Sequence, residues 1–193
     1  MGVQVPPSAP GSLEKGSGRT VAEPSSGRDL QTGLVVDLHA GDRGALRPLF
    51  ELAEDSAALL DEYVTDGRVL VALLDGETVG HLQLVETGRA GELEIKNMAV
   101  REDRQGRGIG ALLVRAAIAR CTAEGRTSLL VATAAAGTGT LRFYQRQGFR
   151  MLSVERDAFT PETGYPAGVA IDGVPLRDRV WLDQPLFSGP GRR

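Results

Sequence analysis

A buried strand that runs into a glycine-rich turn and then into a long helix constrains the fold of this chain more than any other feature. The strand is expected over Glu92–Val100, the turn over 101–108 and the helix over Ile109–Glu124. The helix carries an apolar stripe at helical spacing, formed by Ile109, Leu112, Leu113, Ala116 and Ile118. Gly125 follows where a left-handed C-cap belongs. Such a unit packs a helix on a sheet, which places the chain among α/β proteins.

The rest of the sequence supplies strands and helices around this unit. Apolar runs predict strands over 34–39, 69–74, 78–86, 128–133, 149–154 and 175–182. Helical spacing predicts helices after an Asp42 N-cap, over 57–64 and over 141–147. Asp75-Gly76 and Asp172-Gly173 predict tight turns. The expected fold class is α/β (α+β), a single domain whose mixed central sheet of about six to seven strands is flanked by helices on both faces.

The 193 residues divide into a folded domain and two end segments. Residues 1–31 are dense in Gly, Pro and Ser and lack apolar periodicity, so we expect a disordered N-terminal tail. Residues 32–187 form the expected domain, and 188–193 a frayed C-terminus. The length of the middle segment suits one domain with a sizeable core.

Composition argues against several functions. A formal net charge of −3 provides no basic footprint, so no nucleic-acid partner is expected. No apolar run approaches the roughly 20 residues that span a bilayer, so no membrane partner is expected. Cys121 is the only cysteine, which favours a reducing compartment; we expect a cytoplasmic protein with Cys121 packed in its core. His39 and His81 are too far apart in sequence to suggest a metal pair, so we expect no metal and a structural role for each.

The turn has the chemistry of an anion site. Backbone N–H groups at a helix start have no internal acceptor, and the helix dipole makes that end positive. Glycines at 106, 108 and 110 let a ligand approach the backbone. Arg104 and Arg107 can add charge-assisted contacts, and together these features suit a pyrophosphate. The alternative is a turn that merely connects strand to helix. No Gly-Lys-Ser/Thr follows, so a P-loop is not indicated.

Two motifs give a specific resemblance. Gln105-Gly106-Arg107-Gly108-Ile109-Gly110 resembles the Gln/Arg-x-x-Gly-x-Gly/Ala signature of the GNAT superfamily of N-acetyltransferases. Leu141–Phe149, which reads LRFYQRQGF, resembles the family's Phe-Tyr-x-x-x-Gly-Phe element. The resemblance covers 34–187 in element order, with most of its specificity in 92–149. It implies an N-acetyltransferase that uses acetyl-CoA as co-substrate, and a homodimer is common for the fold.

The resemblance also implies positions that bind the coenzyme. Main-chain groups at the end of the strand would pair with the pantetheine arm, and the matching residues are Met98, Ala99 and Val100. The turn that follows would hold the pyrophosphate. Its implied contacts are Arg104, Gln105, Gly106, Arg107, Gly108, Ile109 and Gly110.

Two residues are candidates for catalysis. Tyr144 matches the family tyrosine that protonates the departing thiolate, and a phenol with a reference pKa of about 10 stays protonated at neutral pH. Glu94 matches a glutamate that in some members takes a proton from the amine; Glu92 is a weaker candidate on the same strand. The alternatives are an aromatic anchor for Tyr144 and a solvent-facing strand residue for Glu94.

The acceptor side is the least specified by sequence. Asp157, Phe159 and Tyr165 lie in a long polar connection and are candidates for lining a pocket for a primary amine of a small molecule. Many family members have asparagine where this chain has Gly137, which puts the coenzyme contacts made there in doubt. Two alternatives therefore stay open: an acetyltransferase acting on a protein N-terminus or lysine, and a coenzyme A-binding sensor with weak or no catalysis.

Overall fold

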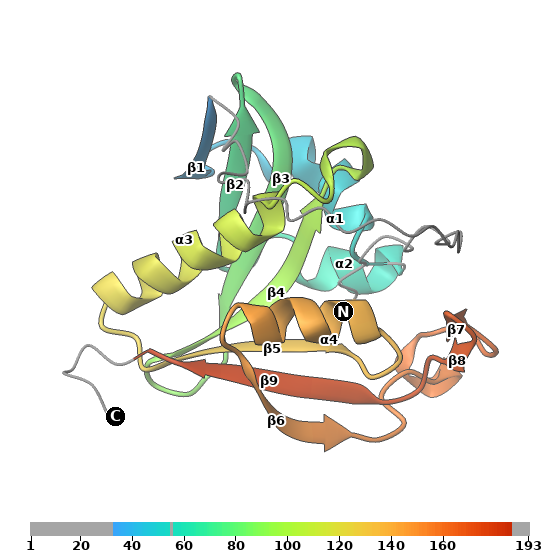
Figure 1. The fold of residues 1–193 in the computed structure, drawn as a ribbon. Coiled ribbons are helices and arrows are strands. Elements are labelled where there is room, and N and C mark those ends of the chain that lie inside the picture. The colour runs from blue at the N-terminus through green and yellow to red at the C-terminus, as the bar shows by residue number, and fades with distance from the viewer. Residues whose placement is uncertain (1–32, 55, 187–193) are drawn as a thin grey trace, which may run out of the picture.

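The computed structural model describes residues 33–54 and 56–186 and contains a seven-stranded mixed sheet with the strand order β1-β2-β3-β4-β5-β9-β6 (Figure 1). The sheet strands are β1 (Leu34–Leu38), β2 (Arg68–Leu74), β3 (Glu77–Glu86), β4 (Glu92–Val100), β5 (Ser128–Ala134), β6 (Arg150–Glu155) and β9 (Arg179–Pro185). A separate hairpin joins β7 (Ala170–Ile171) to β8 (Val174–Pro175). The predicted fold class is confirmed. The predicted tail, 1–31, and the predicted frayed end, 188–193, lie outside the described residues.

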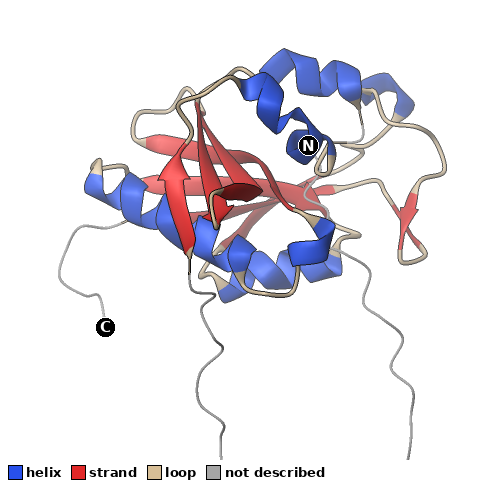
Figure 2. Cartoon of the chain, turned by 90° about the horizontal axis from the view of Figure 1, so that it is seen from above, coloured by secondary structure: helices blue, strands red, loops and turns tan. Residues whose placement is uncertain are grey.

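Helices cover both faces of the sheet (Figures 1 and 2). One face carries α1 (Arg47–Glu51) and α2 (Ala57–Tyr63), and the other carries α3 (Ile109–Ala123) and α4 (Thr138–Arg146). The larger core packs α3 and α4 residues such as Leu113 and Tyr144 against the sheet. The smaller core packs Phe50 and Leu60 against the opposite face of β2.

Local sequence signals explain several of the element ends. Asp42 caps the 3₁₀ turn before α1 by accepting a hydrogen bond from the Gly44 amide, as predicted. Asp75 and Gly76 both take positive φ, 51° and 86°, in the tight β2–β3 turn. Gly125 ends α3 at φ 71°, the left-handed cap position that its lack of a Cβ allows.

Two predicted boundaries are wrong. The strand expected over 175–182 is two separate pieces, because Val174–Pro175 closes the small hairpin and β9 starts only at Arg179, where inward-facing Val180 and Leu182 begin to alternate. The helix expected over 141–147 starts three residues earlier, at Thr138. Thr138, Gly139 and Thr140 are poor helix formers, so tertiary contacts override their propensity.

The sheet opens between β4 and β5, the two central parallel strands. Their pairing runs from Glu92 with Ser128 to Ile95 with Val131, and within the described residues it stops there. Beyond that pair β4 stays bonded to β3, while β5 stays bonded to β9. The carboxyl ends of β4 and β5 therefore part, as Figure 1 shows, and the free edge of β4 over 96–100 is available to a ligand.

Candidate active site

The turn between β4 and α3 leaves amides free at the helix start, although the Gln105 N–H earlier in the turn donates to the Glu102 carbonyl at 3.3 Å. Gly106 and Gly108 have φ of 72° and 82°, and a Cβ on either would meet nothing within 4 Å. The first hydrogen bond of α3 runs from the Leu112 N–H to the Gly108 carbonyl at 3.0 Å, so the N–H groups of residues 109–111 have no acceptor among the described residues. Such a helix start binds anions.

Side chains around the turn divide into structural and available ones. The Gln105 side-chain amide donates to the Val100 carbonyl at 2.9 Å and so fixes the turn to the end of β4. Arg104 lies with its Nε 3.3 Å from the Asp103 carboxylate, and this buried Nε makes no hydrogen bond within the described chain. Arg107 is exposed. Both arginines therefore stay candidates for a phosphate contact at the turn.

The two sequence motifs meet in space. A Cβ on Gly110 would lie 3.4 Å from the Phe143 ring and 3.9 Å from Met98 Cε, so this glycine lets β4, α3 and α4 approach closely. The Phe143 ring contacts the Tyr144 ring at a centroid distance of 5.1 Å. Met98 and Ala99 are themselves buried side chains, which leaves main-chain atoms as the part of β4 that a ligand could use.

Tyr144 is buried with its hydroxyl unsatisfied. The side chain is 0% exposed and packs edge-on against Phe149 at 5.4 Å, but the hydroxyl has no hydrogen-bond partner in the described structure. Burial raises the pKa of the Tyr144 phenol, so it stays protonated at neutral pH. A buried hydroxyl without a partner destabilises the fold, and it is suited to donate a hydrogen bond to a bound ligand.

Glu94 lies on the other face of the sheet from Tyr144. Its neighbours Leu93 and Ile95 point into the α3–α4 core, so alternation turns Glu94 toward α1 and α2. The side chain is 10% exposed, and Oε1 makes no hydrogen bond to a described residue. Burial raises the pKa of the Glu94 carboxyl, and the charges of Lys96 and Arg179 lower it to a smaller extent.

Lys96 and Arg179 are two cations near Glu94 that the sequence analysis did not single out. Lys96 Nζ lies 4.0 Å from Glu94 Oε1 and 5.1 Å from the centroid of the Tyr63 ring. The Arg179 guanidinium lies 5.1 Å from the centroid of the Phe159 ring. One signal was available for Lys96: the chain has 20 arginines and two lysines, and Lys96 is the only lysine in the described part.

The connection between β6 and β9 contributes aromatic residues to the same face. Phe159 and Tyr165 are buried and contact each other edge-on at 4.9 Å, with Leu59 of α2 and Ala134 of β5 packed against them. Asp157 instead pairs with Arg177 at 2.6 Å in an exposed part of the connection. Glu92, the weaker base candidate, accepts a hydrogen bond from Thr87 Oγ1 at 2.8 Å.

Gly137 is the N-cap of α4. Its φ is −79°, a value open to any residue, but a Cβ there would lie 3.3 Å from the Ala134 carbonyl oxygen. Asparagine at this position would therefore require its neighbours to move by a few tenths of an ångström. The helix start is packed around the missing side chain.

Cys121 and His81 are buried on α3 and β3. Cys121 lies in the larger core, which confirms the packing role predicted for it. His81 Nε2 lies 2.8 Å from Asn97 Oδ1, its ring lies 4.2 Å from the Phe50 ring, and burial lowers its pKa to about 3. The Asn97 amide in turn donates to the Tyr63 hydroxyl at 3.0 Å. His81 is thus a neutral residue that ties the sheet to α2.

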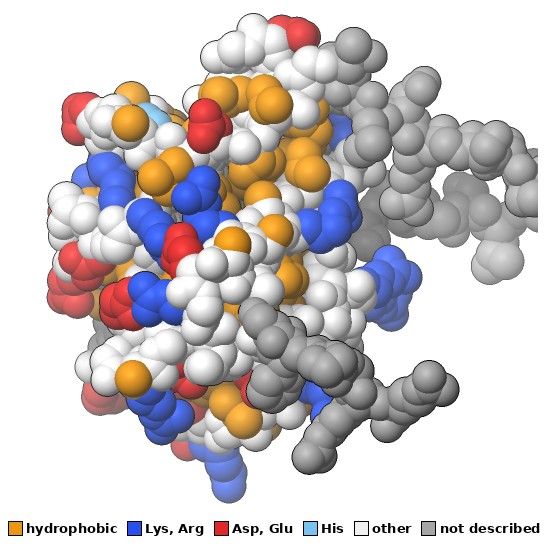
Figure 3. Space-filling view, turned by 90° about the vertical axis from the view of Figure 1, so that its left-hand side faces the viewer, with side chains coloured by type: hydrophobic (Ala, Val, Ile, Leu, Met, Phe, Trp, Pro, Cys, Tyr) orange, Lys and Arg blue, Asp and Glu red, His pale blue; other side chains and the backbone are white. Residues whose placement is uncertain are grey.

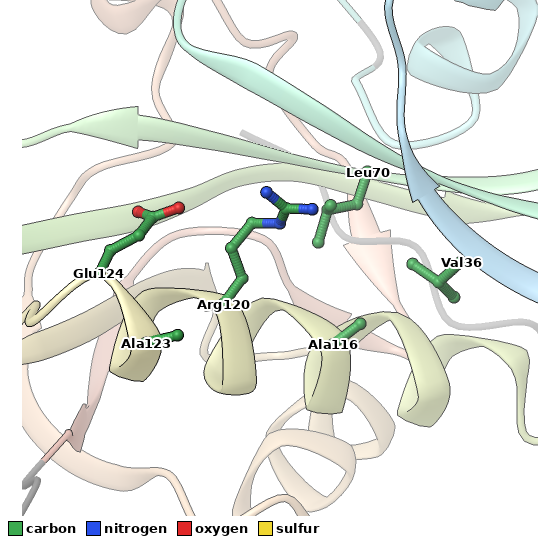
Figure 4. A pocket seen from close by; sticks show the side chains of 6 residues that line it. All are labelled: Val36, Leu70, Ala116, Arg120, Ala123 and Glu124. Atoms are coloured by element: carbon green, nitrogen blue, oxygen red, sulfur yellow. The ribbon is translucent and has the colours of Figure 1, made fainter.

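A hollow of about 340 Å³ lies elsewhere, between α3 and the β1–β2 edge, with Arg120 pointing across it toward Leu70 (Figure 4). Figure 3 shows this side of the molecule, where charged side chains interrupt the hydrophobic ones. A rise of 1.5 Å per residue places Arg120 roughly 18 Å along the helix from Gly108. The hollow is therefore separate from the turn and from the opening of the sheet.

The described residues, 33–54 and 56–186, contain no group of three or more His, Cys, Asp or Glu side chains that could hold a metal ion. None of their helices is both long and apolar enough to cross a membrane.

The free amides at the start of α3, the open edge of β4 and the protonated phenol of α4 fit an acyltransferase of the coenzyme A-dependent class. Residues 38–149 match the model of the acetyltransferase (GNAT) family, and the chain belongs to this family. It is 31% identical over 152 residues to the uncharacterized N-acetyltransferase YvbK of Bacillus subtilis, covering 78% of this chain and 96% of that protein.

Solved structures share the fold. An IAA acetyltransferase from Bacillus cereus aligns with a TM-score of 0.71 and 32% identity, over 79% of this chain and 99% of that one. A GNAT family acetyltransferase from Elizabethkingia anophelis with acetyl-CoA bound aligns with a TM-score of 0.73 and 28% identity, over 80% and 99%. The protein is therefore an N-acetyltransferase with acetyl-CoA as co-substrate, and its open turn and unpaired Tyr144 hydroxyl fit that group.

Proposed function

We propose that this acetyltransferase moves the acetyl group to a primary amine of a small molecule, with Glu94 as base and Tyr144 as acid. The observation that carries the proposal is the position of these two side chains on opposite faces of the sheet. Both can reach one thioester only where β4 and β5 part, next to the end of their shared ladder at Ile95 and Val131. The geometry thus supports attack from the α2 side and departure toward α4.

The coenzyme supplies an activated acyl group as a thioester. The turn amides and the Arg104 and Arg107 side chains hold its pyrophosphate, and the free edge of β4 at Met98, Ala99 and Val100 orients its arm. Glu94 receives the proton that the attacking amine loses, directly or through water. As the new C–N bond forms, the C–S bond breaks, and the Tyr144 hydroxyl donates its proton to the departing sulfur.

Phe159 and Tyr165 lie beside Arg179 and support an acceptor site on the α2 side of the opening. Asp157 is a less direct candidate because its carboxylate is engaged by Arg177. The cytoplasmic location and a homodimer stay predictions from the sequence.

Release of free thiol from acetyl-CoA over a panel of small primary amines, N-terminal peptides and lysine peptides tests the proposal. Turnover of a small amine above the rate of background hydrolysis is expected. Turnover confined to peptides would overturn the small-molecule assignment. Tight binding of acetyl-CoA with no turnover on any acceptor would instead favour the sensor alternative.

A further inference from the structure

Lys96 carries unused hydrogen-bond donors toward the acceptor side. It is the extra residue of a β-bulge, since Gln83 pairs with Asn97 while Leu84 pairs with Ile95, and Lys96 has no partner on β3. Its Nζ stands over the Tyr63 ring and donates no hydrogen bond to a described residue. The side chain is only 19% exposed. The ammonium is paired with Glu94 and with the Tyr63 ring, and it still has hydrogen-bond donors that no described residue accepts.

Arg179 presents a second such cation from the opposite side of the opening. Its backbone pairs with Ala134 of β5, and its Nη1 donates to Glu155 Oε2 at 2.9 Å. Its Nε is buried and has no acceptor among the described residues. The contact with the Phe159 ring and the hydrogen bond to Glu155 both restrain the guanidinium that carries this free donor.

Glu94 lies within the field of both cations, which both draw its pKa down. Lys96 and Arg179 are each paired with one carboxylate, Glu94 and Glu155, yet both keep donors that no described residue accepts. An acceptor with only an amine, or a polyamine, would bring further donors and leave these unsatisfied. An amine that also carries a carboxylate can satisfy them, because the carboxylate accepts from the two cations while the amine faces Glu94.

We infer that the acceptor is an amino acid-like zwitterion whose carboxylate is bound by Lys96 and Arg179 and whose amine is directed at Glu94. This inference rests on the proposed function. The apolar part of the acceptor lies against Phe159 and Tyr165. The ammonium of the zwitterion gives one proton to Glu94, and the free amine nitrogen then bonds to the acetyl carbon as the C–S bond breaks. The nitrogen loses its second proton to water, and the Tyr144 phenolate regains one from water. The coenzyme leaves as a thiol after taking the Tyr144 proton, and the product is an N-acetyl amino acid.

The test compares acceptors that differ only in the carboxylate. Initial rates of thiol release are measured for leucine against isoamylamine, and for phenylalanine against phenethylamine and phenylalaninamide. The carboxylate members are expected to have a kcat/KM at least 10-fold higher. Lys96→Met keeps the length of the chain over Tyr63 but removes the charge, and should raise the KM for the amino acid about 10-fold or more with an unchanged KM for acetyl-CoA.

Control variants separate binding from folding. Lys96→Arg keeps the charge and should retain much of the preference for acceptors with a carboxylate. Arg179→Gln should lose this preference, as Lys96→Met does. Arg120→Met removes a cation from the distant hollow on α3 and should leave the kcat/KM for acceptors with and without a carboxylate unchanged. If the Met variant does not fold, the wild-type comparison and Lys96→Arg still decide the question.

Three results would overturn the inference. The first is equal or faster turnover of the amines that lack a carboxylate, which leaves the proposed function standing. The second is acetylation of Lys96 itself, seen as a mass gain on its tryptic peptide, because Lys96 would then be a substrate. The third is the absence of turnover on every small amine, which removes the proposed function along with it.

Discussion

At the scale of single residues, the hydroxyl of Tyr144 is a buried polar atom without a hydrogen-bond partner. The side chain is fully buried, and this oxygen is one of seven buried side-chain N or O atoms with no partner among the described residues. Each such atom in a folded protein needs an explanation. A hydrogen bond to a bound ligand would explain this unpaired hydroxyl. Its removal should then affect catalysis and protein stability differently.

Tyr144→Phe should lower kcat by about 100-fold or more, the usual contribution of a general acid. Because the lost oxygen makes no hydrogen bond in the described structure, the melting temperature should stay equal or rise slightly. Steady-state kinetics and thermal unfolding of the same preparations measure both, with coenzyme affinity expected to change little. Unaltered turnover would remove Tyr144 from the mechanism, and a marked loss of stability would mean that the hydroxyl has a structural partner.

Glu94→Gln should lower activity and raise stability at neutral pH. The pKa of Glu94 is raised in the folded state, so the fold favours the protonated carboxyl. This group therefore stabilises the folded state at low pH, and its contribution to stability is lost as pH rises through the raised pKa. The neutral amide should therefore be the more stable protein at pH 7, with an advantage that disappears toward pH 4. Thermal unfolding across this range measures the difference.

The same variant should lose about 100-fold in kcat/KM, and the wild-type rate should fall as acid protonates Glu94. Glu92→Gln is the matched control, because Glu92 is tied to Thr87 and should leave both properties nearly unchanged. A Glu94→Gln enzyme with wild-type rates would exclude Glu94 as the base.

Sequence motifs predict Glu94, Tyr144 and the turn as candidate site residues, but they do not point to Lys96 and Arg179. The motif residues are contiguous in sequence and carry recognisable chemistry. The two cations come from β4 and β9, 83 positions apart in the printed numbering, and only the sheet topology brings both near Glu94. An arginine in an arginine-rich chain gives no local signal, whereas the scarcity of lysine would have drawn attention to Lys96.

At the scale of elements, α3 offers a comparison between its two ends. Gly108 and Gly125 both take positive φ, 82° and 71°, and neither has an atom within 4 Å of where a Cβ would stand. Substitution at either end therefore imposes similar backbone strain, roughly 1 kcal/mol. Only the first end faces the proposed pyrophosphate.

Gly108→Val should weaken coenzyme A binding at least 10-fold, because the side chain restricts access to the free amides and disturbs their conformation. Gly125→Val should lower the free energy of unfolding about as much as Gly108→Val does, but should bind coenzyme A with wild-type affinity. Calorimetric titration and denaturant unfolding of the pair separate these effects. Equal affinity in the two variants would move the pyrophosphate away from the turn.

Elements with strong local signals were predictable, and those held by distant contacts were not. The capped helix α3 and the Asp75-Gly76 hairpin have their determinants within a few residues. The first turn of α4 has none, because Gly139 opposes a helix and the turn forms on the end of β5, where the Gly137 N–H bonds to the Ala134 carbonyl at 3.0 Å. The start of β9 likewise depends on its register against β5 and β6, which adjacent residues do not encode.

At the scale of the whole molecule, the two halves of the sheet meet along a short seam. One half contains β1 to β4 and the other contains β5, β9 and β6, and the ladder between them joins only Glu92–Ile95 to Ser128–Val131. A coenzyme held by the turn on one side and reaching Tyr144 of α4 on the other would bridge this seam. It would then bind the folded protein and not the unfolded chain.

Coenzyme A at 100 times its Kd should therefore stabilise the protein by about 2.7 kcal/mol, with a corresponding rise in melting temperature. Pantetheine, which has the same arm but no phosphates, should stabilise the protein little if the turn provides most of the binding free energy. Added salt should lower the affinity for coenzyme A more than the affinity for pantetheine. Hydrogen exchange locates the contact: amides over 96–100 in β4 and 106–111 in the turn should exchange more slowly with coenzyme A bound, while those of β1 should not change. Protection that appears only around the hollow lined by Val36 and Arg120 would place the ligand on the wrong end of α3 and contradict the site.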